Sequence, residues 1–345
     1  MVKRFLHIDF LRAVAILAVI SIHVFSDNIT SRLNFYIWNY LHIIIVAFVF
    51  CSGYVMYAAY APKITTWFGI LTFYKKRLLR LLLPFYYYLI AHFALMLLFP
   101  KFFSGLGLIF SWNFIWQSVT LVGGINLNWL PLLFLQLAVL FPLLVFAFAK
   151  KKILFWLYVV VAFLVTIGFT IWQFPYSHYR AVMWIPWSLF LVIPWYFYQK
   201  EQKKFTAVPY LSISLISGIF FVGLYFLWMH LGRSLTLIDN KYPPNFFYIL
   251  YECFGSFFLL AISGWKILKI SWVVASYKYV SRASYGLFFI HYIVMDFILS
   301  VSKNYALHLS VWTETIFVIA VSILVSLILT KGQKIIKLTP GRENR

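Results

Sequence analysis

Residues 129–149 read WLPLLFLQLAVLFPLLVFAFA and contain no charged side chain. A helix that crosses a bilayer needs about 20 consecutive, mostly apolar residues, and this stretch is long enough. Hydrophobic residues make up 64% of the 345-residue chain and charged residues only 11%, whereas about a quarter of the residues of a soluble domain are charged. The composition therefore excludes a soluble enzyme and predicts a helical membrane protein.

Ten segments satisfy the same length rule, so we expect an all-α integral membrane protein with about ten transmembrane helices. We expect one transmembrane domain over residues 1–345 and no soluble domain. A further stretch, 105–124, contains Ser, Asn, Gln and Thr side chains, so we expect an interfacial or re-entrant helix on the outer side. The predicted spans are 10–25, 35–60, 81–99, 129–149, 153–173, 184–198, 207–231, 246–265, 284–302 and 311–330.

The distribution of positive charge orients these spans. The chain has 29 Lys and Arg against 8 Asp and Glu, a net charge of +21. Most of the positive side chains fall in alternate loops, and such loops face the cytosol. We therefore expect both termini to be cytoplasmic and no nucleic acid as a partner. The two cysteines lie within apolar runs, so we expect no disulfide framework and no metal site.

Asp9, Arg12 and His23 are ionisable side chains in or beside the first span, where such groups mark candidate functional sites. Asp9 and Arg12 are three residues apart and can pair. Arg12 and His23 are eleven residues apart, which on a helix brings them to within about 20° of one stripe and about 16 Å apart along the axis. The alternative is that Arg12 and His23 extend separately to the inner and outer headgroups.

The sequence YKKRLLR, residues 74–80, precedes the third predicted span. Arg77 and Arg80 are one helical turn apart, and together with Lys76 they can bind a multiply charged phosphate compound. The alternative is the ordinary positive charge of a cytosolic loop.

These features resemble the membrane acyltransferases called acyltransferase family 3, over nearly the whole chain. This sequence departs from the family pattern at two positions. Gln136 stands where many members have Glu, and Ala13 stands where Gly is common. Gln136 puts in doubt any mechanism that requires a carboxylate in that helix. The matching motifs are Ile8-Asp9 and Arg12 followed by His23, Phe50-Cys51-Ser52-Gly53-Tyr54, Arg77 and Arg80 with Pro84, Asn128-Trp129-Leu130 with Phe141-Pro142, Tyr242-Pro243-Pro244, and Ser284-Tyr285-Gly286 with Ile290-His291.

The resemblance implies transfer of an acyl group, usually acetyl, from cytosolic acetyl-CoA to a hydroxyl of a surface glycan or its lipid-linked precursor. Arg12, Arg77, Arg80 and Lys76 would then hold coenzyme A, and His23 would act as general base. Asp27 is one possible orienting group for His23, and an acyl-His intermediate is an alternative mechanism. The resemblance also implies a multi-pass protein of a bacterial cytoplasmic membrane, with polysaccharide synthase or export machinery as a possible partner.

Other polar and aromatic residues have two interpretations each. Glu252 and Asp296 can hold an acceptor sugar or pair with a base such as His291. Trp129 and Tyr242 can stack on sugars or belong to the interfacial aromatic belt. We expect Ser52 and Gly53 to let helices approach closely, and Tyr285 and His291 to have supporting roles.

Two functions of other classes remain open from the sequence. A transporter or flippase for a lipid-linked glycan would also carry intramembrane Arg and His residues. A structural subunit of a polysaccharide synthase would tolerate replacement of Arg12 and His23.

Overall fold

The computed structural model describes residues 4–103, 111–172, 174, 178–201, 205–307 and 309–338. Within these residues the chain forms helices and no β-strand. The longer helices are α1 (Leu6–Ser26), α3 (Ile45–Tyr60), α4 (Trp67–Leu98), α7 (Trp129–Lys150), α8 (Lys152–Ile171), α10 (Trp184–Glu201), α11 (Val208–His230), α12 (Phe246–Ile262), α13 (Ser271–Asn304) and α14 (Val311–Leu338). The shorter ones are α2 (Arg32–Tyr40), η1 (Ala61–Lys63), α5 (Pro100–Phe103), α6 (Trp112–Val119), η2 (Asn126–Asn128), α9 (Tyr179–Val182), η4 (Ile238–Asn240) and η5 (Lys266–Lys269).

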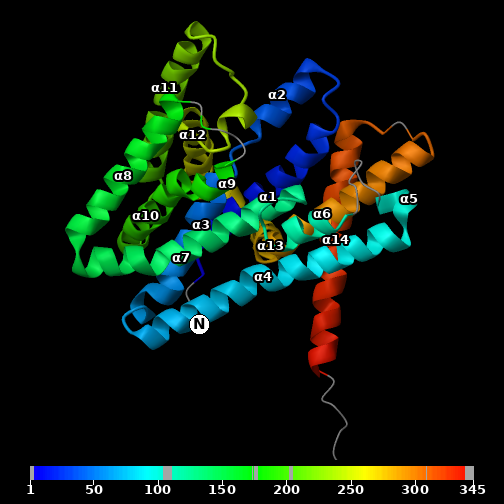
Figure 1. The fold of residues 1–345 in the computed structure, drawn as a ribbon, viewed down its shortest axis with the longest axis horizontal. Coiled ribbons are helices and arrows are strands. Elements are labelled where there is room, and N and C mark those ends of the chain that lie inside the picture. Colours follow the sequence, from blue (N-terminus) through cyan, green and yellow to red (C-terminus); the bar gives the residue numbers. More distant parts are fainter. Residues whose placement is uncertain are drawn as a thin grey trace, which may run out of the picture.

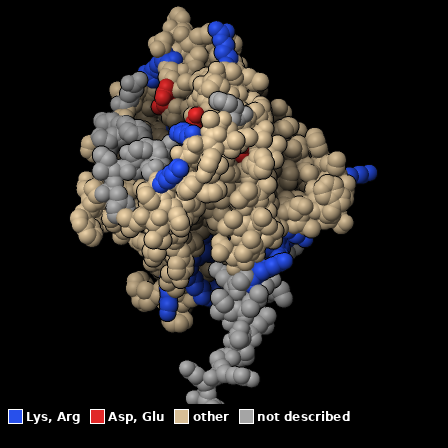
Figure 2. Space-filling view, turned by 90° about the vertical axis from the view of Figure 1, so that its right-hand side faces the viewer, with Lys and Arg blue, Asp and Glu red and all other residues tan. Residues whose placement is uncertain are grey.

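The predicted membrane fold is confirmed. Nine segments of the described chain are long and apolar enough to span a bilayer, and α12 is a shorter apolar helix. Helices α8 and α11 bury only a small part of their surface and expose many large apolar side chains, as expected of helices that face lipid. On the face drawn in Figure 2, Lys and Arg side chains gather at the lower end, and the band just above them shows almost no coloured side chain; further Lys and Arg and a few Asp or Glu side chains lie higher up.

Helix α1 lies inside the bundle, where it packs along α13 and also contacts α3, α12 and α14. Helix α3 packs along α10, and α11 packs along α12. Figure 1 shows that α1 begins and α14 ends toward the same end of the bundle. We call this end, with the first turn of α1 and the α3–α4 connection, the basic side. The end with α2 and the α11–α12 connection is the opposite side.

The second predicted span, 35–60, lies within a segment, Arg32–Lys63, that is long and apolar enough to cross a membrane, but its helix is not continuous, because the chain breaks between α2 and α3. A broken helix is tolerated in a membrane only where its free backbone groups find partners inside the protein. Here α12 supplies them: Ile45 N–H donates to Glu252 Oε1 at 2.7 Å, and Ser256 Oγ donates to the Ile43 carbonyl at 2.9 Å. The approach requires Gly255, since a Cβ there would stand 2.5 Å from Ile43 Cγ2.

Two other helices extend far beyond their predicted spans on the basic side. Helix α4 begins at Trp67 rather than residue 81, with Thr66 Oγ1 accepting from Gly69 N–H at 3.1 Å as a cap. Helix α13 begins at Ser271 rather than residue 284. Arg77 and Arg80 therefore lie on a helix and not in a loop. A hydropathy criterion detects only the apolar part of a helix, and Lys and Arg continue helices well.

Within the predicted interfacial helix at 105–124, residues 111–124 are described, and they contain helix α6. It has 8 residues, which is too short to span a membrane, and Ser111 Oγ caps its first turn. Trp112 and Trp116 are exposed. Residues 105–110 of the predicted segment lie outside the described residues.

Candidate active site

A cavity of about 400 Å³ lies among α1, α3, α4, α7 and α13 on the basic side. The lining contains one acidic residue, Asp9, and five arginines: Arg4, Arg12, Arg77, Arg80 and Arg282. A cleft lined mainly by one sign of charge concentrates ligands of the opposite sign. Guanidinium groups bind phosphate in a two-pronged geometry. The cavity is thus suited to an anion with several phosphate groups.

Arg12 and Arg77 are anchored on adjacent residues of α3. Arg12 Nη2 donates to the Cys51 carbonyl at 3.3 Å, and Arg77 Nη2 donates to Ser52 Oγ at 2.5 Å. Among the described residues, the buried Arg77 Nε has no hydrogen-bond partner. Arg12 and Arg80 act electrostatically on Arg77, so the three like charges repel one another. A bound anion would relieve that repulsion and use the free Nε–H.

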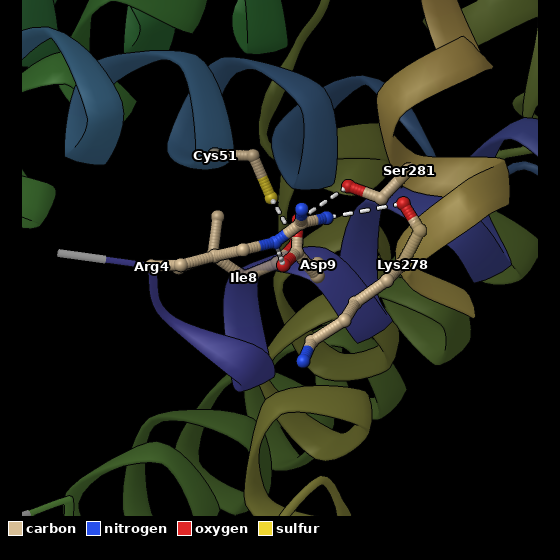
Figure 3. Close-up of polar contacts among 6 residues, drawn as sticks. All are labelled: Arg4, Ile8, Asp9, Cys51, Lys278 and Ser281. Carbon is tan, nitrogen blue, oxygen red and sulfur yellow. Dashed lines mark hydrogen bonds and ion pairs between the residues drawn. The ribbon is translucent and has the colours of Figure 1, made fainter. Parts of the chain in front are cut away.

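Asp9 does not pair with Arg12 as the sequence suggested. Figure 3 shows that Arg4 Nε donates to Asp9 Oδ2, while Ser281 Oγ donates to Asp9 Oδ1 at 2.7 Å. Arg4 also donates to the Lys278 carbonyl at 3.0 Å. These contacts join the start of α1 to α13, which leaves the Arg12 guanidinium directed at α3 and the cavity.

Three other predicted residues lie around this cavity in different ways. Tyr285 lines it and donates through its hydroxyl to the Leu81 carbonyl at 2.8 Å. Gly53 faces α10, where an added Cβ would stand 3.0 Å from Pro194 Cγ, so this glycine allows the two helices to approach. Lys76 is exposed and is not part of the lining.

His23, near the opposite end of α1, is paired with His291 of α13. His23 Nδ1 and His291 Nε2 are 2.8 Å apart, and the two rings are parallel to within 4°. Asp27, the other candidate to orient His23, follows the last residue of α1, and burial raises the pKa of its carboxyl group. In the described structure the hydrogen-bond partner of the His23 ring is His291.

The hydrogen bonds of His291 determine which nitrogen of His23 carries a proton. His291 Nδ1 lies 2.9 Å from the Leu287 carbonyl, and a carbonyl oxygen only accepts, so this Nδ1 is the protonated nitrogen. In neutral His291 the other nitrogen, Nε2, then accepts from Nδ1–H of His23. The lone pair of neutral His23 is consequently on Nε2. A ring oriented in this way can act as a general base at Nε2.

Phe288 lies between the arginine cavity and the histidine pair. Its ring lines the cavity and lies 6.0 Å from the His291 ring, whereas His23 is not among the lining residues. The space beside Arg12 is thus separated from the histidines by about one aromatic side chain.

Three of the four residues predicted to bind the acceptor surround Lys241, in the α11–α12 connection. Lys241 Nζ lies 4.8 Å from the Trp129 ring centre and 4.9 Å from that of Tyr242. Glu252 acts electrostatically on Lys241. Glu252 also accepts from Trp187 Nε1 at 3.3 Å, in addition to capping α3. Its position therefore has a structural explanation that the sequence did not indicate.

Asp296 lies in a different place, between α13 and α4. Its carboxylate is 3.8 Å from His92 Nδ1, so the base beside it is His92 and not His291. Both groups are buried. The structure does not bring Asp296 to the cluster around Lys241.

Sequence reasoning missed three residues of this arrangement and gave a fourth, His291, only a supporting role. Arg4, Arg282 and Lys241 are ordinary loop charges in a topology count. His291 was recognised only as a supporting residue, because its contact with His23 joins residues 268 positions apart. For Arg4, Arg282 and Lys241 the sequence signal is that each is a charged residue beside an apolar span, whereas His291 also belongs to a motif that matches the family pattern.

Comparison with known families decides the class of the protein. The model of an acyltransferase domain, Acyl_transf_3, matches residues 5–331. The chain belongs to the acyltransferase 3 family. In this acyltransferase the histidine pair, Lys241 and the cavity arginines other than Arg4 lie within the matched range. No match was found among curated proteins or solved structures.

Proposed function

We propose that this acyltransferase transfers an acetyl group from acetyl-CoA, bound on the basic side, to a hydroxyl of a carbohydrate that reaches His23 from the opposite side. The observation that carries the proposal is the bond chain from His23 to His291 to the Leu287 carbonyl, which leaves His23 Nε2 free to accept a proton. A general base and a polyanion site are the two parts that a coenzyme A-dependent acyl transfer needs.

The arginine cavity supports coenzyme A as the donor. Coenzyme A carries a diphosphate and a further phosphate, and five guanidinium groups line this cavity. Arg77 Nε–H and the partly exposed Arg80 and Arg282 are placed to bind phosphate oxygens. The pantetheine arm would extend past Arg12 toward Phe288. This direction would bring the thioester toward the histidine pair.

The transfer then needs one proton acceptor and one leaving group. His23 Nε2 takes the proton of the acceptor hydroxyl as its oxygen attacks the thioester carbonyl carbon, and the carbonyl oxygen becomes an oxyanion. When the carbon–sulfur bond breaks, the coenzyme A thiolate leaves and receives the proton from His23. The products are an ester and free coenzyme A, and His23 returns to its starting tautomer.

The same proposal places the protein in a bacterial cytoplasmic membrane with the basic side toward the cytosol, where acetyl-CoA is made. The abundance of Lys and Arg on this side supports that orientation. A glycan or a lipid-linked sugar is the acceptor class that the location favours. A polysaccharide synthase or exporter would then supply it.

The test compares cells that lack the protein with cells that express the wild type, His23→Ala or His230→Ala. His230 is the control because it also lies near the opposite end of a helix but is exposed. We expect radiolabelled acetyl from acetyl-CoA to appear as ester on surface glycan with the wild type and with His230→Ala only. Purified His23→Ala should still bind coenzyme A.

Acetyl transfer that persists with His23→Ala would overturn the role of His23. If loss of the protein stops glycan export while the acetyl content of each exported chain is unchanged, the protein is a transporter and the proposal is wrong.

A further inference from the structure

Lys241 is an unusual charge for the inside of a membrane protein. Only 6% of the Lys241 surface is exposed to solvent, and lysines are seldom buried to this extent unless they are paired. Among the described residues, its ammonium group has no hydrogen-bond partner and no carboxylate within 4 Å. The rings of Trp129 and Tyr242 hold it through cation–π contacts instead. Its N–H donors are therefore free for a ligand.

The surroundings fix the ammonium in place. The Trp129 and Tyr242 rings meet edge to face at 5.3 Å, and Trp129 stacks on Trp187 at 5.9 Å. Lys241 N–H donates to the Ile238 carbonyl at 3.2 Å, which ties the residue to η4. A hydrogen-bond donor that is held rigidly before the reaction stabilises developing negative charge without the cost of reorientation.

The position of Lys241 relates it to the histidine pair. Lys241 lies in the α11–α12 connection and His23 lies near the end of α1, so both are on the opposite side of the bundle. Lys241 also acts electrostatically on His23 and His42. The arginines are on the far side of Phe288 and line the donor cavity. Lys241 is thus a cation near His23 that is not part of the donor cavity.

Resting on the proposed function, we propose that Lys241 is a second catalytic residue, whose ammonium group binds the oxyanion formed when the acceptor hydroxyl attacks the thioester. The balance of the step is as follows: the acceptor oxygen bonds to the carbonyl carbon, its proton goes to His23 Nε2, and the carbonyl π electrons become the oxyanion beside Lys241. Collapse restores the carbonyl and expels the thiolate, which takes the proton from His23. Lys241 donates hydrogen bonds throughout and transfers no proton.

The charged state of Lys241 has a measurable pH dependence. Burial lowers the pKa of Lys241, and the Glu252 carboxylate acts in the opposite direction. The other titratable groups that face it are His23, His42 and Tyr242. With a pKa of about 8, the ammonium is mostly present at neutral pH and is lost as the pH rises through about 8, below the ordinary lysine value of about 10.4. Arginine stays charged over that range.

The experiment compares purified wild type with Lys241→Met, which keeps the length but not the charge, and Lys241→Arg, which keeps the charge. We expect kcat to fall about 10²–10³-fold in Lys241→Met, the loss seen when one oxyanion donor is removed, with KM for acetyl-CoA unchanged. Lys241→Arg should recover at least part of kcat. Its activity relative to wild type should rise with pH above neutrality.

Two results would overturn the proposal. One is a folded Lys241→Met protein whose kcat is within about twofold of wild type. The other is a loss in both variants that follows a lower thermal midpoint, or a rise in the acceptor KM with kcat unchanged, because these mean a structural or binding role. His23→Ala is run in parallel: retained transfer in that variant refutes the proposed function itself, independently of Lys241.

Discussion

Replacement of His291 by leucine tests the catalytic arrangement most directly. The change removes the acceptor for His23 Nδ1–H and puts an apolar side chain in the fully buried position of His291. His23 then loses the bond that selects its tautomer, and its N–H is left without a protein partner at a partly buried site. We expect the variant to fold and to bind coenzyme A, because the arginine cavity lies on the other side of Phe288.

The size of the effect follows from the hydrogen bond that is lost. An unsatisfied buried donor costs about 1–3 kcal/mol. If that cost falls on the productive His23 orientation, kcat falls about 5- to 150-fold, at about 1.4 kcal/mol for each tenfold change. KM for acetyl-CoA should stay within about twofold, because the contacts that bind acetyl-CoA equally in the ground state and the transition state are unaffected.

His291→Gln is the matched control, because a glutamine side-chain oxygen can accept the same hydrogen bond. The assay is steady-state acetyl transfer by purified protein, with thermal midpoints for all variants. A second measurement is the ¹⁵N spectrum of labelled histidine, which should show His23 protonated at Nδ1 and not at Nε2. The reasoning is refuted if His291→Leu folds and keeps full kcat, or if the spectrum shows the other tautomer.

Three further variants test the remaining parts of the structure. Arg77→Ala should weaken coenzyme A binding at least tenfold, and more at low salt than at high salt, while Lys76→Ala, exposed on the same helix, should leave the Kd from titration calorimetry unchanged. Gly255→Ala should destabilise the protein by about 1–3 kcal/mol through overpacking against the α2–α3 connection, whereas Gly223→Ala, which meets no atom within 4 Å, should not lower the thermal midpoint. Phe288→Trp should slow transfer without changing coenzyme A affinity; equal losses in both would contradict its place between the two sites.

The sequence predicted the fold class and the approximate number of spans well, because both follow from a local property. An apolar stretch of sufficient length partitions into a bilayer whatever its neighbours are. Its errors occurred where the outcome depends on other helices. The chain breaks before Ile45 because Glu252 and Ser256, more than 200 residues away, satisfy the free backbone groups. No pattern within residues 35–60 records those partners.

The same distinction applies to the candidate site. Arg12, His23, Arg77 and Arg80 are identifiable from sequence because a charge in or beside an apolar span is costly and therefore conspicuous. Helical periodicity also predicted that Arg12 and His23 share one stripe of α1. The partners of these residues are a different matter. Asp9 pairs with Arg4 and not with Arg12, although Arg12 is nearer in sequence.

The sequence by itself determined that the chain crosses a membrane about ten times and that α1 carries a cation and an imidazole, since hydropathy and helical pitch act over a few residues. Only the tertiary structure decided which nitrogen of His23 is free, that Phe288 lies beside both the five arginines' cavity and His291, and that Lys241 contacts two aromatic rings. Those properties arise from side chains brought together by packing, and contact across hundreds of residues leaves no local periodicity to detect.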